Sequence, residues 1–321
     1  MIVPDIIEID LDASPAKRWE FARSYSNEIN ELVVCYWKEI DEYAELIQEY
    51  IGLYKSLYIP QAYQEEIRCL AQYCKFTEDQ LLIVNLYYDI IKIGFACTAF
   101  AFEQSDSIWH ARNLDWWTEN DLLAKYAKVF HWKKGGKTVF KSVGWMGFIG
   151  VLSGMKPHQF SITLNAVLSE EAPNFAKPIS FLLREVLEDN HTYQSAKEKL
   201  ETTPIVCDCL LLLAGTKAGE IAVIERTPTK SQTRYANQQH IVVTNDYKTA
   251  IVNDNHRQNI LTDTSCMRYD KAKALLLQQF PNDEAACFQI LDDEAVKMTI
   301  TVQQMVFNAD KDLVFTKEPS M

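Results

Sequence analysis

The chain has 321 residues, of which 48% are hydrophobic and 24% are charged, a composition typical of globular proteins with a sizeable core. This length suits one large domain or two ordinary ones. The formal net charge of -12 at pH 7 argues against a nucleic-acid partner, because phosphate binding requires a concentrated cationic surface, and the sequence contains no run rich in lysine and arginine.

The N-terminal segment lacks the features of an export signal. Acidic residues crowd its first ten positions, where such a signal would carry a basic segment followed by an apolar one. No stretch approaches the ~18 uninterrupted apolar residues of a transmembrane helix. The eight cysteines are therefore expected to be reduced thiols, and the protein is expected to be cytoplasmic.

The first 96 residues are predicted to be helical. Pro15 precedes a long amphipathic pattern whose apolar residues fall at helical spacings, namely Trp19, Tyr25, Ile29, Leu32, Val33 and Tyr36. Pro60 can occupy the first turn of a second helix. Thr77 and Gln80 form a capping-box pattern at the start of a third.

After residue 96 the pattern changes to period two, which is typical of β-strands. Cys97, Ala99 and Ala101 alternate with larger or polar residues, and a second strand is predicted over 107–112. Residues 134–137, Lys-Gly-Gly-Lys, are typical of a hairpin turn between two further strands. More strands are predicted over 148–152, 159–164, 206–213, 221–225 and 240–244. Helical patterns return over 179–200, 267–280 and 283–292. The second part is therefore predicted to be α+β with antiparallel strands.

The surroundings of Cys97 suggest chemistry. A cysteine at the head of a strand is usually an inert buried thiol. Here Arg112 and Asp115 follow on the strand expected to pair with it, which would bring both beside Cys97. An arginine near a thiol lowers its pKa, and the thiolate is the nucleophile. Alternatively, Arg112 and Asp115 form an ordinary ion pair at a strand end.

Several ordered segments carry a family resemblance. Cys97-Thr98 followed by the segment 110–115, His-Ala-Arg-Asn-Leu-Asp, resembles the nucleophile region of acid ceramidase and N-acylethanolamine acid amidase, within the choloylglycine-hydrolase group of N-terminal-nucleophile (Ntn) hydrolases. The resemblance extends over most of the chain, through the segments 10–19, 86–89, 147–157 and 244–245.

The resemblance implies a four-layer αββα sandwich of antiparallel sheets in which Cys97 opens a central strand. It also implies a precursor (zymogen) that cuts itself between Ala96 and Cys97. Residues 1–96, a helical leader or α-subunit, would stay associated with the catalytic part, residues 97–321. The freed α-amine of Cys97, a group whose ordinary pKa is ~7.7–8.0, would act as general base. Neither a metal nor an organic cofactor is expected.

The resemblance also assigns roles to individual residues. Arg112 would orient the substrate, Asp115 would hold the Cys97 amine, and Asn245 would donate to the oxyanion. Two adjacent residues, His256 and Arg257, could correspond to the family's second arginine. Arg257 is expected to brace that corner of the site, because a histidine cannot reproduce a permanently charged planar group.

Asn165 resembles the family's mid-chain substrate-binding residue. Here it is followed by Ala166-Val167, where the relatives carry Glu-Arg, so two charges are missing from this neighbourhood. Asn245 before Asp246 is also a typical turn sequence, which is a second interpretation of that residue.

The expected reaction is hydrolysis of the C–N bond in fatty-acyl amides, such as N-acylethanolamines or ceramides. Aromatic and apolar residues of the leader, such as Tyr54, Leu57 and Tyr58, could form an acyl tunnel and touch a membrane surface transiently. Two alternatives stay open. One is an unprocessed, non-catalytic lipid-binding relative, and the other is an acyltransferase that uses the same thioester.

Overall fold

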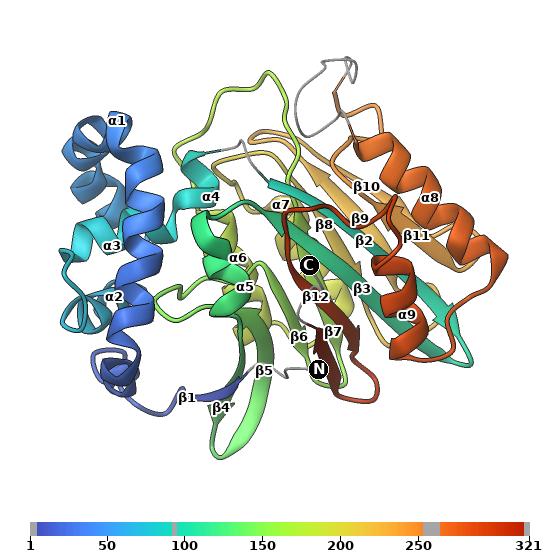
Figure 1. Ribbon diagram of the computed structural model, residues 1–321, viewed down its shortest axis with the longest axis horizontal. Coiled ribbons are helices and arrows are strands. Elements are labelled where there is room, and N and C mark those ends of the chain that lie inside the picture. Colours follow the sequence, from blue (N-terminus) through green and yellow to red (C-terminus); the bar gives the residue numbers. More distant parts are fainter. Residues whose placement is uncertain (1–4, 92–94, 253–263, 318–321) are drawn as a thin grey trace.

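Two β-sheets lie face to face at the centre of the computed structural model, which describes residues 5–91, 95–252 and 264–317 (Figure 1). The larger sheet has the order β1-β4-β5-β6-β7-β8-β9-β10 and the smaller one the order β11-β2-β3-β12-β13. Except for the parallel β1–β4 pair, neighbouring strands are antiparallel. The strands of the larger sheet are β1 (Asp5–Asp10), β4 (Lys128–Lys134), β5 (Lys137–Gly144), β6 (Ser153–Lys156), β7 (Phe160–Asn165), β8 (Cys209–Ala214), β9 (Ile221–Arg226) and β10 (Ser231–Tyr235). Those of the smaller sheet are β11 (His240–Val243), β2 (Phe95–Gln104), β3 (Ser107–Trp116), β12 (Thr301–Asn308) and β13 (Leu313–Lys317).

Helices cover the outer face of each sheet. In Figure 1, α8 (Ser265–Gln278) and α9 (Glu284–Leu291) lie on the smaller sheet, where they pack against β2, β3, β11 and β12. The outer face of the larger sheet is covered by α6 (Ile179–Asp189) and α7 (Tyr193–Thr202). The order of layers is therefore helix, sheet, sheet, helix, which confirms the predicted αββα architecture.

The helices of the N-terminal part gather at one end of this sandwich, at the left of Figure 1. They are the 3-10 helix η1 (Glu20–Tyr25), α1 (Ser26–Tyr58), α2 (Gln61–Ala71), α3 (Glu78–Asn85) and α4 (Tyr87–Ile90). Pro60 directly precedes α2, and Thr77 and Gln80 form the predicted capping box at the start of α3. Two short helices, η2 (Glu119–Asp121) and α5 (Leu122–Lys125), follow β3. Within the described ranges, no helix is both long and apolar enough to span a membrane.

The prediction that the first 96 residues are only helical is wrong at both ends. The first described residues form β1, in which buried Ile7 and Ile9 alternate with exposed neighbours. This strand adds to the edge of the larger sheet beside β4. At the other end, Phe95 and Ala96 already belong to β2. The N-terminal part is thus joined to the sandwich through backbone hydrogen bonds as well as through side chains.

Other element boundaries also differ from the prediction. Residues 148–152 form no strand; instead Val151 donates a backbone hydrogen bond to the carbonyl of Ser180 (3.0 Å) on α6. A Cβ atom at Gly150 would lie 2.8 Å from Ser180, so glycine allows this close approach. The helical pattern over 179–200 is divided between α6 and α7. The predicted hairpin is confirmed, with Gly135 and Gly136 at φ +57° and +72° between β4 and β5.

A buried charge network ties the N-terminal part to α6. Both oxygens of Glu66 accept from the Arg184 guanidinium at 2.7 Å, one also contacts Arg18, and the other accepts from Trp19 Nε1 at 2.8 Å. The Glu66 and Arg184 side chains are fully buried. Burial by itself would raise the pKa of Glu66, but the charge and hydrogen bonds of Arg184, helped by Arg18, lower it below its usual value.

Candidate active site

The sequence predicted that Cys97 is the first residue of its strand. In the structure it is the third residue of β2. The strand is paired on both sides, with β3 and β11, and the Ala96–Cys97 peptide bond lies inside it. In the register, Ala96 is opposite Asp115 and Cys97 is opposite Leu114. The thiol side chain is buried, with 1% of Cys97 exposed. In this continuous chain the nucleophile candidate therefore lies in a closed site.

Arg112 contacts the thiol as predicted. Its Nη2 lies 3.2 Å from Cys97 Sγ and also donates to the carbonyl of Leu164. Its Nη1 donates to the carbonyl of Leu152 (3.0 Å) and to Ser153 Oγ. These partners belong to the facing sheet and to the segment that enters it, so the guanidinium is fixed between the two sheets. It supplies a positive charge beside the sulfur, where a thiolate would form.

Asn245, two residues beyond β11, contacts the backbone of Cys97. Its Oδ1 accepts from the Cys97 amide nitrogen (3.1 Å) and from Arg268 Nη2 (2.7 Å), while its Nδ2 donates to the carbonyl of Ala166 (2.8 Å). A guanidinium can only donate, so the amide atom that faces Arg268 must be the oxygen. Asn245 thus presents an acceptor to the Cys97 nitrogen. Its oxyanion role stays a prediction.

Asp115 lies on β3, beside the bond expected to break. One of its oxygens accepts from Thr301 Oγ1 at 2.5 Å, and the other has no hydrogen-bond partner within the described ranges. Burial raises the pKa of Asp115, and this effect outweighs the opposing influence of Arg268, Thr301 and Arg112. Asp115 therefore keeps one lone-pair-bearing oxygen in a buried site next to Ala96.

The folded-state pKa of Asp115 is raised, so the ionised carboxylate destabilises the fold as the pH rises through that value. Below the unfolded-state pKa the carboxyl group is protonated in both states and does not change the stability. Asp115→Asn is therefore expected to raise the melting temperature at pH 7.5, by roughly a few degrees, and to leave it unchanged near pH 4. Thermal unfolding of both proteins in a Cys97→Ala background measures this without cleavage. A lower melting temperature at pH 7.5 would contradict the assignment.

Arg268 is a site residue that the sequence prediction missed. From the first turn of α8, its Nη1 donates to the carbonyl of Cys97 (2.7 Å) and to Thr98 Oγ1 (2.9 Å). Arg257, the predicted second arginine, lies outside the described residues. Arg268 braces Asn245 and the Cys97 backbone at once. The sequence does contain a signal for Arg268, because an arginine is unusual in the buried stripe of a helix. The buried stripe of α8 consists of Ser265, Arg268, Ala272 and Leu276.

The loop that carries Asn245 is held by further buried groups. Ser265 Oγ accepts from the Asn245 backbone nitrogen (2.9 Å) and bonds Thr244 and Asp246. Glu225 of β9 accepts from the backbone nitrogens of Lys248 and Thr249. These contacts fix the loop to α8 and to the larger sheet.

Asn165 lies at the end of β7 and contacts the strand that leads to Asn245. Its Nδ2 donates to the carbonyls of Val243 (3.2 Å) and Thr244 (3.0 Å). Its Oδ1 is buried, and no partner for it lies in the described part of the chain. Asn165 thus supports the Asn245 corner, and its substrate-binding role stays a prediction.

His110 lies on β3 away from the thiol. Its ring nitrogens are 2.9 Å from Ser161 Oγ and Thr163 Oγ1. Burial, helped by the Arg112 charge, lowers the pKa of His110 to about 3. The ring is neutral at physiological pH and has a structural place between the sheets.

A narrow apolar cavity of about 40 Å³ adjoins the site. Its walls come from α1, α3 and α4 on one side and from the sandwich and α5 on the other, and they include Leu32, Tyr36, Trp116, Leu123, Trp145 and Leu152. Trp116 follows Asp115, and the Leu152 carbonyl accepts from Arg112. The volume would admit only a few water molecules.

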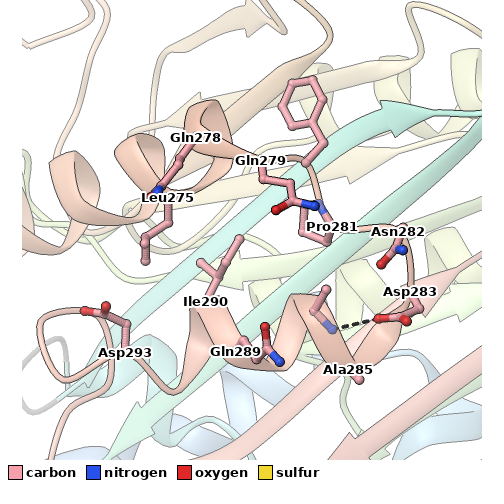
Figure 2. A pocket seen from close by; sticks show the side chains of 12 residues that line it. Leu275, Gln278, Gln279, Pro281, Asn282, Asp283, Ala285, Gln289, Ile290 and Asp293 are labelled. Carbon is pink, nitrogen blue, oxygen red and sulfur yellow. Dashed lines mark hydrogen bonds between the residues drawn. The ribbon is translucent and has the colours of Figure 1, made fainter.

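A second groove lies between α8 and α9, on the outer face of the smaller sheet (Figure 2). Leu275 and Ile290 point into it, and amide side chains such as Gln279 and Asn282 line its rim. The dashed line in Figure 2 marks the cap of α9 by Asp283, which accepts from the Ala286 nitrogen at 2.8 Å. None of the predicted site residues lines this groove.

Two facing sheets with a buried cysteine, an arginine on its sulfur and an asparagine on its nitrogen define an Ntn-hydrolase architecture. The chain belongs to the acyl-coenzyme A:6-aminopenicillanic acid acyl-transferase family, whose sequence profile matches residues 102–308.

The curated relatives confirm the resemblance seen in the sequence. Acid ceramidase of Balaenoptera acutorostrata scammoni is 28% identical over 255 residues, which cover 70% of this chain and 63% of the relative. N-acylethanolamine-hydrolyzing acid amidase of Rattus norvegicus is 28% identical over 242 residues, covering 70% of this chain and 64% of the relative. The chain thus spans less than two thirds of the length of these relatives.

A solved structure agrees with the fold. The Caenorhabditis elegans N-acylethanolamine-hydrolyzing acid amidase ortholog matches with a TM-score of 0.56 and 26% sequence identity. The match covers 67% of this chain and 93% of that one.

Proposed function

We propose that the protein is a self-processing cysteine amidase that hydrolyses fatty-acyl amides. The observation that carries the proposal is the double hold on Cys97, whose sulfur lies 3.2 Å from Arg112 and whose nitrogen lies 3.1 Å from Asn245 Oδ1. One residue is thus prepared both as a nucleophile and, once its amine is free, as a base.

Self-cleavage begins with attack of the Cys97 sulfur on the Ala96 carbonyl. The C–N bond between the two residues breaks, a thioester forms, and the proton of the thiol passes to the leaving nitrogen. Water then hydrolyses the thioester to an Ala96 carboxylate and a free thiol. Asn245 Oδ1, which already accepts from this nitrogen, would then hold the new α-amine, and the partnerless oxygen of Asp115 is a second acceptor on the same strand pair.

Amide hydrolysis repeats the same chemistry on a substrate. The α-amine takes the thiol proton as the sulfur attacks the acyl carbon, and it then protonates the departing amine. Water opens the thioester to the fatty acid and restores the thiol. Arg112 supplies positive charge at the sulfur throughout, and its four polar contacts keep it in place.

The apolar cavity beside Trp116 and Leu152 is the proposed start of the acyl site. Its volume of about 40 Å³ is too small for an acyl chain, so the side chains of α1 and of the sandwich must separate to admit one. The relatives named as acid ceramidase and N-acylethanolamine-hydrolyzing acid amidase support ceramide-like or ethanolamide substrates. The proposed site spans residues 1–96 and 97–321, which would stay associated after cleavage.

Among the residues of α1 whose burial is described, five large apolar ones are exposed, and all but Val34 have spacings of seven, three and four that place them on one helix face. These four are Tyr43, Tyr50, Leu53 and Leu57, with exposed fractions of 54%, 48%, 59% and 61%. This face is proposed to touch a membrane surface transiently. Leu57→Asp is expected to lower the hydrolysis rate of vesicle-bound long-chain amides roughly tenfold while sparing soluble short-chain amides, because a charge opposes apolar insertion. Equal rates on both substrates would remove the proposed contact.

The decisive test of the function is product analysis with N-lauroylethanolamine. Cleaved protein is expected to release lauric acid and ethanolamine in equal amounts, measured by mass spectrometry. With added hydroxylamine, a hydroxamate that replaces most of the acid would favour the acyltransferase alternative, which shares the thioester. Cleaved protein that binds the amide without turnover would leave the lipid-binding alternative.

A further inference from the structure

Tyr36 of α1 brings a polar group to the apolar cavity. It is 6% exposed, it lines the cavity, and its hydroxyl has no hydrogen-bond partner among residues 5–91, 95–252 and 264–317. Four other polar side chains in the same wall have hydrogen-bond partners. Asn85 bonds three backbone groups, Trp145 Nε1 donates to the Leu123 carbonyl (2.7 Å), Tyr87 contacts Glu39, and Tyr88 donates to the Asp208 carbonyl (3.2 Å).

Gln303 of β12 is a second buried polar group of this kind. In the register Cys97 is opposite Leu114, and Leu114 is opposite Gln303, which follows a register irregularity in β12. The next residue, Gln304, bonds Asn113 on the α9 side of the sheet, so Gln303 shares the face between the sheets with Leu114 and Cys97. Gln303 is 3% exposed, and neither its Oε1 nor its Nε2 has a partner in the described part of the chain. Met305, the next residue of β12 on this face, is fully buried and apolar.

Tyr36 packs against Trp116, and Gln303 lies on β12, the strand next to that of Trp116. The rings of Tyr36 and Trp116 have centroids 5.5 Å apart. Gln303 is diagonal to Trp116, because its direct neighbour on β3 is Leu114. Trp116 and Leu123 both line the cavity, and α5, which contains Leu123, packs against β12. Tyr36 thus places a hydroxyl in the cavity lining, and Gln303, which does not itself line the cavity, places an amide on the other side of β3 from Cys97.

Buried polar groups without partners lower stability, and apolar side chains of similar shape would avoid this cost. Phenylalanine at 36 and methionine at 303 would suffice if the acyl site held only a hydrocarbon chain. A hydroxyl and a carboxamide both donate to oxygen, and each can accept from a hydroxyl. Their presence fits an acyl chain that carries such a group.

We propose that the acyl site selects acyl chains with a hydroxyl or keto oxygen, held by Tyr36 and Gln303. Neighbouring strands are ~4.8 Å apart, so Gln303 lies about 10 Å from Cys97 across β3, which puts the oxygen in the half of the chain nearer the amide. This inference rests on the proposed function for its reaction, while the binding preference can be measured without turnover.

The experiment compares lauroyl ethanolamides that carry no hydroxyl, or one hydroxyl at successive carbons. Wild type is expected to favour at least one hydroxylated amide over the plain one by roughly tenfold or more in kcat/KM, because a built hydrogen-bonding site rejects analogues that lack the group. Tyr36→Phe and Gln303→Met are each expected to lower this ratio several-fold. Tyr63→Phe is the matched control, since it also removes a buried hydroxyl without a partner in the described ranges, but outside the cavity lining. It should keep the ratio.

Equal or better use of the plain amide by wild type would overturn the inference, as would an unchanged ratio in both variants. Calorimetric binding of lauric and hydroxylauric acids to cleaved wild-type protein separates the two proposals, because free acids contain no amide bond to hydrolyse. Preferential binding of a hydroxylated acid, lost in the Tyr36→Phe and Gln303→Met variants, would uphold this inference even if no amide were hydrolysed. Equal binding of both acids would reject it.

Discussion

Cys97→Ala is expected to abolish self-cleavage and amide hydrolysis together. Intact mass measured under denaturing conditions after incubation across roughly pH 4–8, a range that spans carboxylate and α-amine pKa values, should show wild type as two fragments. Scaling 37.0 kDa by 96/321 and 225/321 places them at roughly 11 and 26 kDa, and the variant should stay whole. Hydrolysis of N-lauroylethanolamine should fall to background, because both nucleophile and base come from this residue.

Cys266→Ser is the matched control, because Cys266 is an exposed thiol on α8 that contacts none of the Cys97 atoms among the described interactions. It should cleave and hydrolyse as wild type does. Uncleaved wild type at every pH would reject self-processing and leave the lipid-binding alternative. Fragments that also appear with Cys97→Ala would point to another nucleophile or to a contaminating protease.

The pairing of Arg112 with the thiol could be predicted because it depends on local chain geometry. Ser105 and Asp106, both with positive φ, make a two-residue turn that aligns β2 and β3 along their whole length. In that register Arg112 is opposite Ala99, one diagonal step from Cys97, and its long side chain covers the distance. Hairpin spacing therefore carried enough information to place an arginine at the sulfur.

Arg268 and the orientation of Asn245 could not be obtained in the same way. Arg268 lies 171 positions from Cys97 in sequence, so no spacing rule connects them. The direction of the Asn245 amide is fixed by Arg268 as a pure donor, and therefore depends on that same distant contact.

Among the strands that were not predicted, β12 and β10 were missed for local reasons. In β12, two adjacent glutamines, Gln303 and Gln304, interrupt the apolar alternation because one points into each layer of the fold. In β10, every residue is exposed or partly exposed, so the strand has no hydrophobic period to detect.

Glu66→Gln is expected to lower the free energy of unfolding by about 3–5 kcal/mol at pH 7, since it removes the shared anion from two arginines and leaves their charges under-compensated in a buried site. Arg184 is fully buried and Arg18 is 9% exposed, so water cannot replace the lost carboxylate easily. Urea unfolding in a Cys97→Ala background gives the difference. Glu119→Gln, which breaks the exposed Lys38–Glu119 pair, should cost less than about 1 kcal/mol.

The effect of Glu66→Gln should depend on pH in one direction. The folded-state pKa of Glu66 is lowered, so its contribution is fully present above the unfolded value of ~4.3 and is lost as pH falls through the folded value. The difference in free energy of unfolding between wild type and variant should therefore become smaller under acidic conditions. Because Glu66 and Arg184 lie on opposite sides of the proposed cleavage point, the cleaved variant should also separate more readily on size-exclusion chromatography in moderate urea. Equal stability of variant and wild type at pH 7 would show that the buried charge network does not help to hold the two parts together.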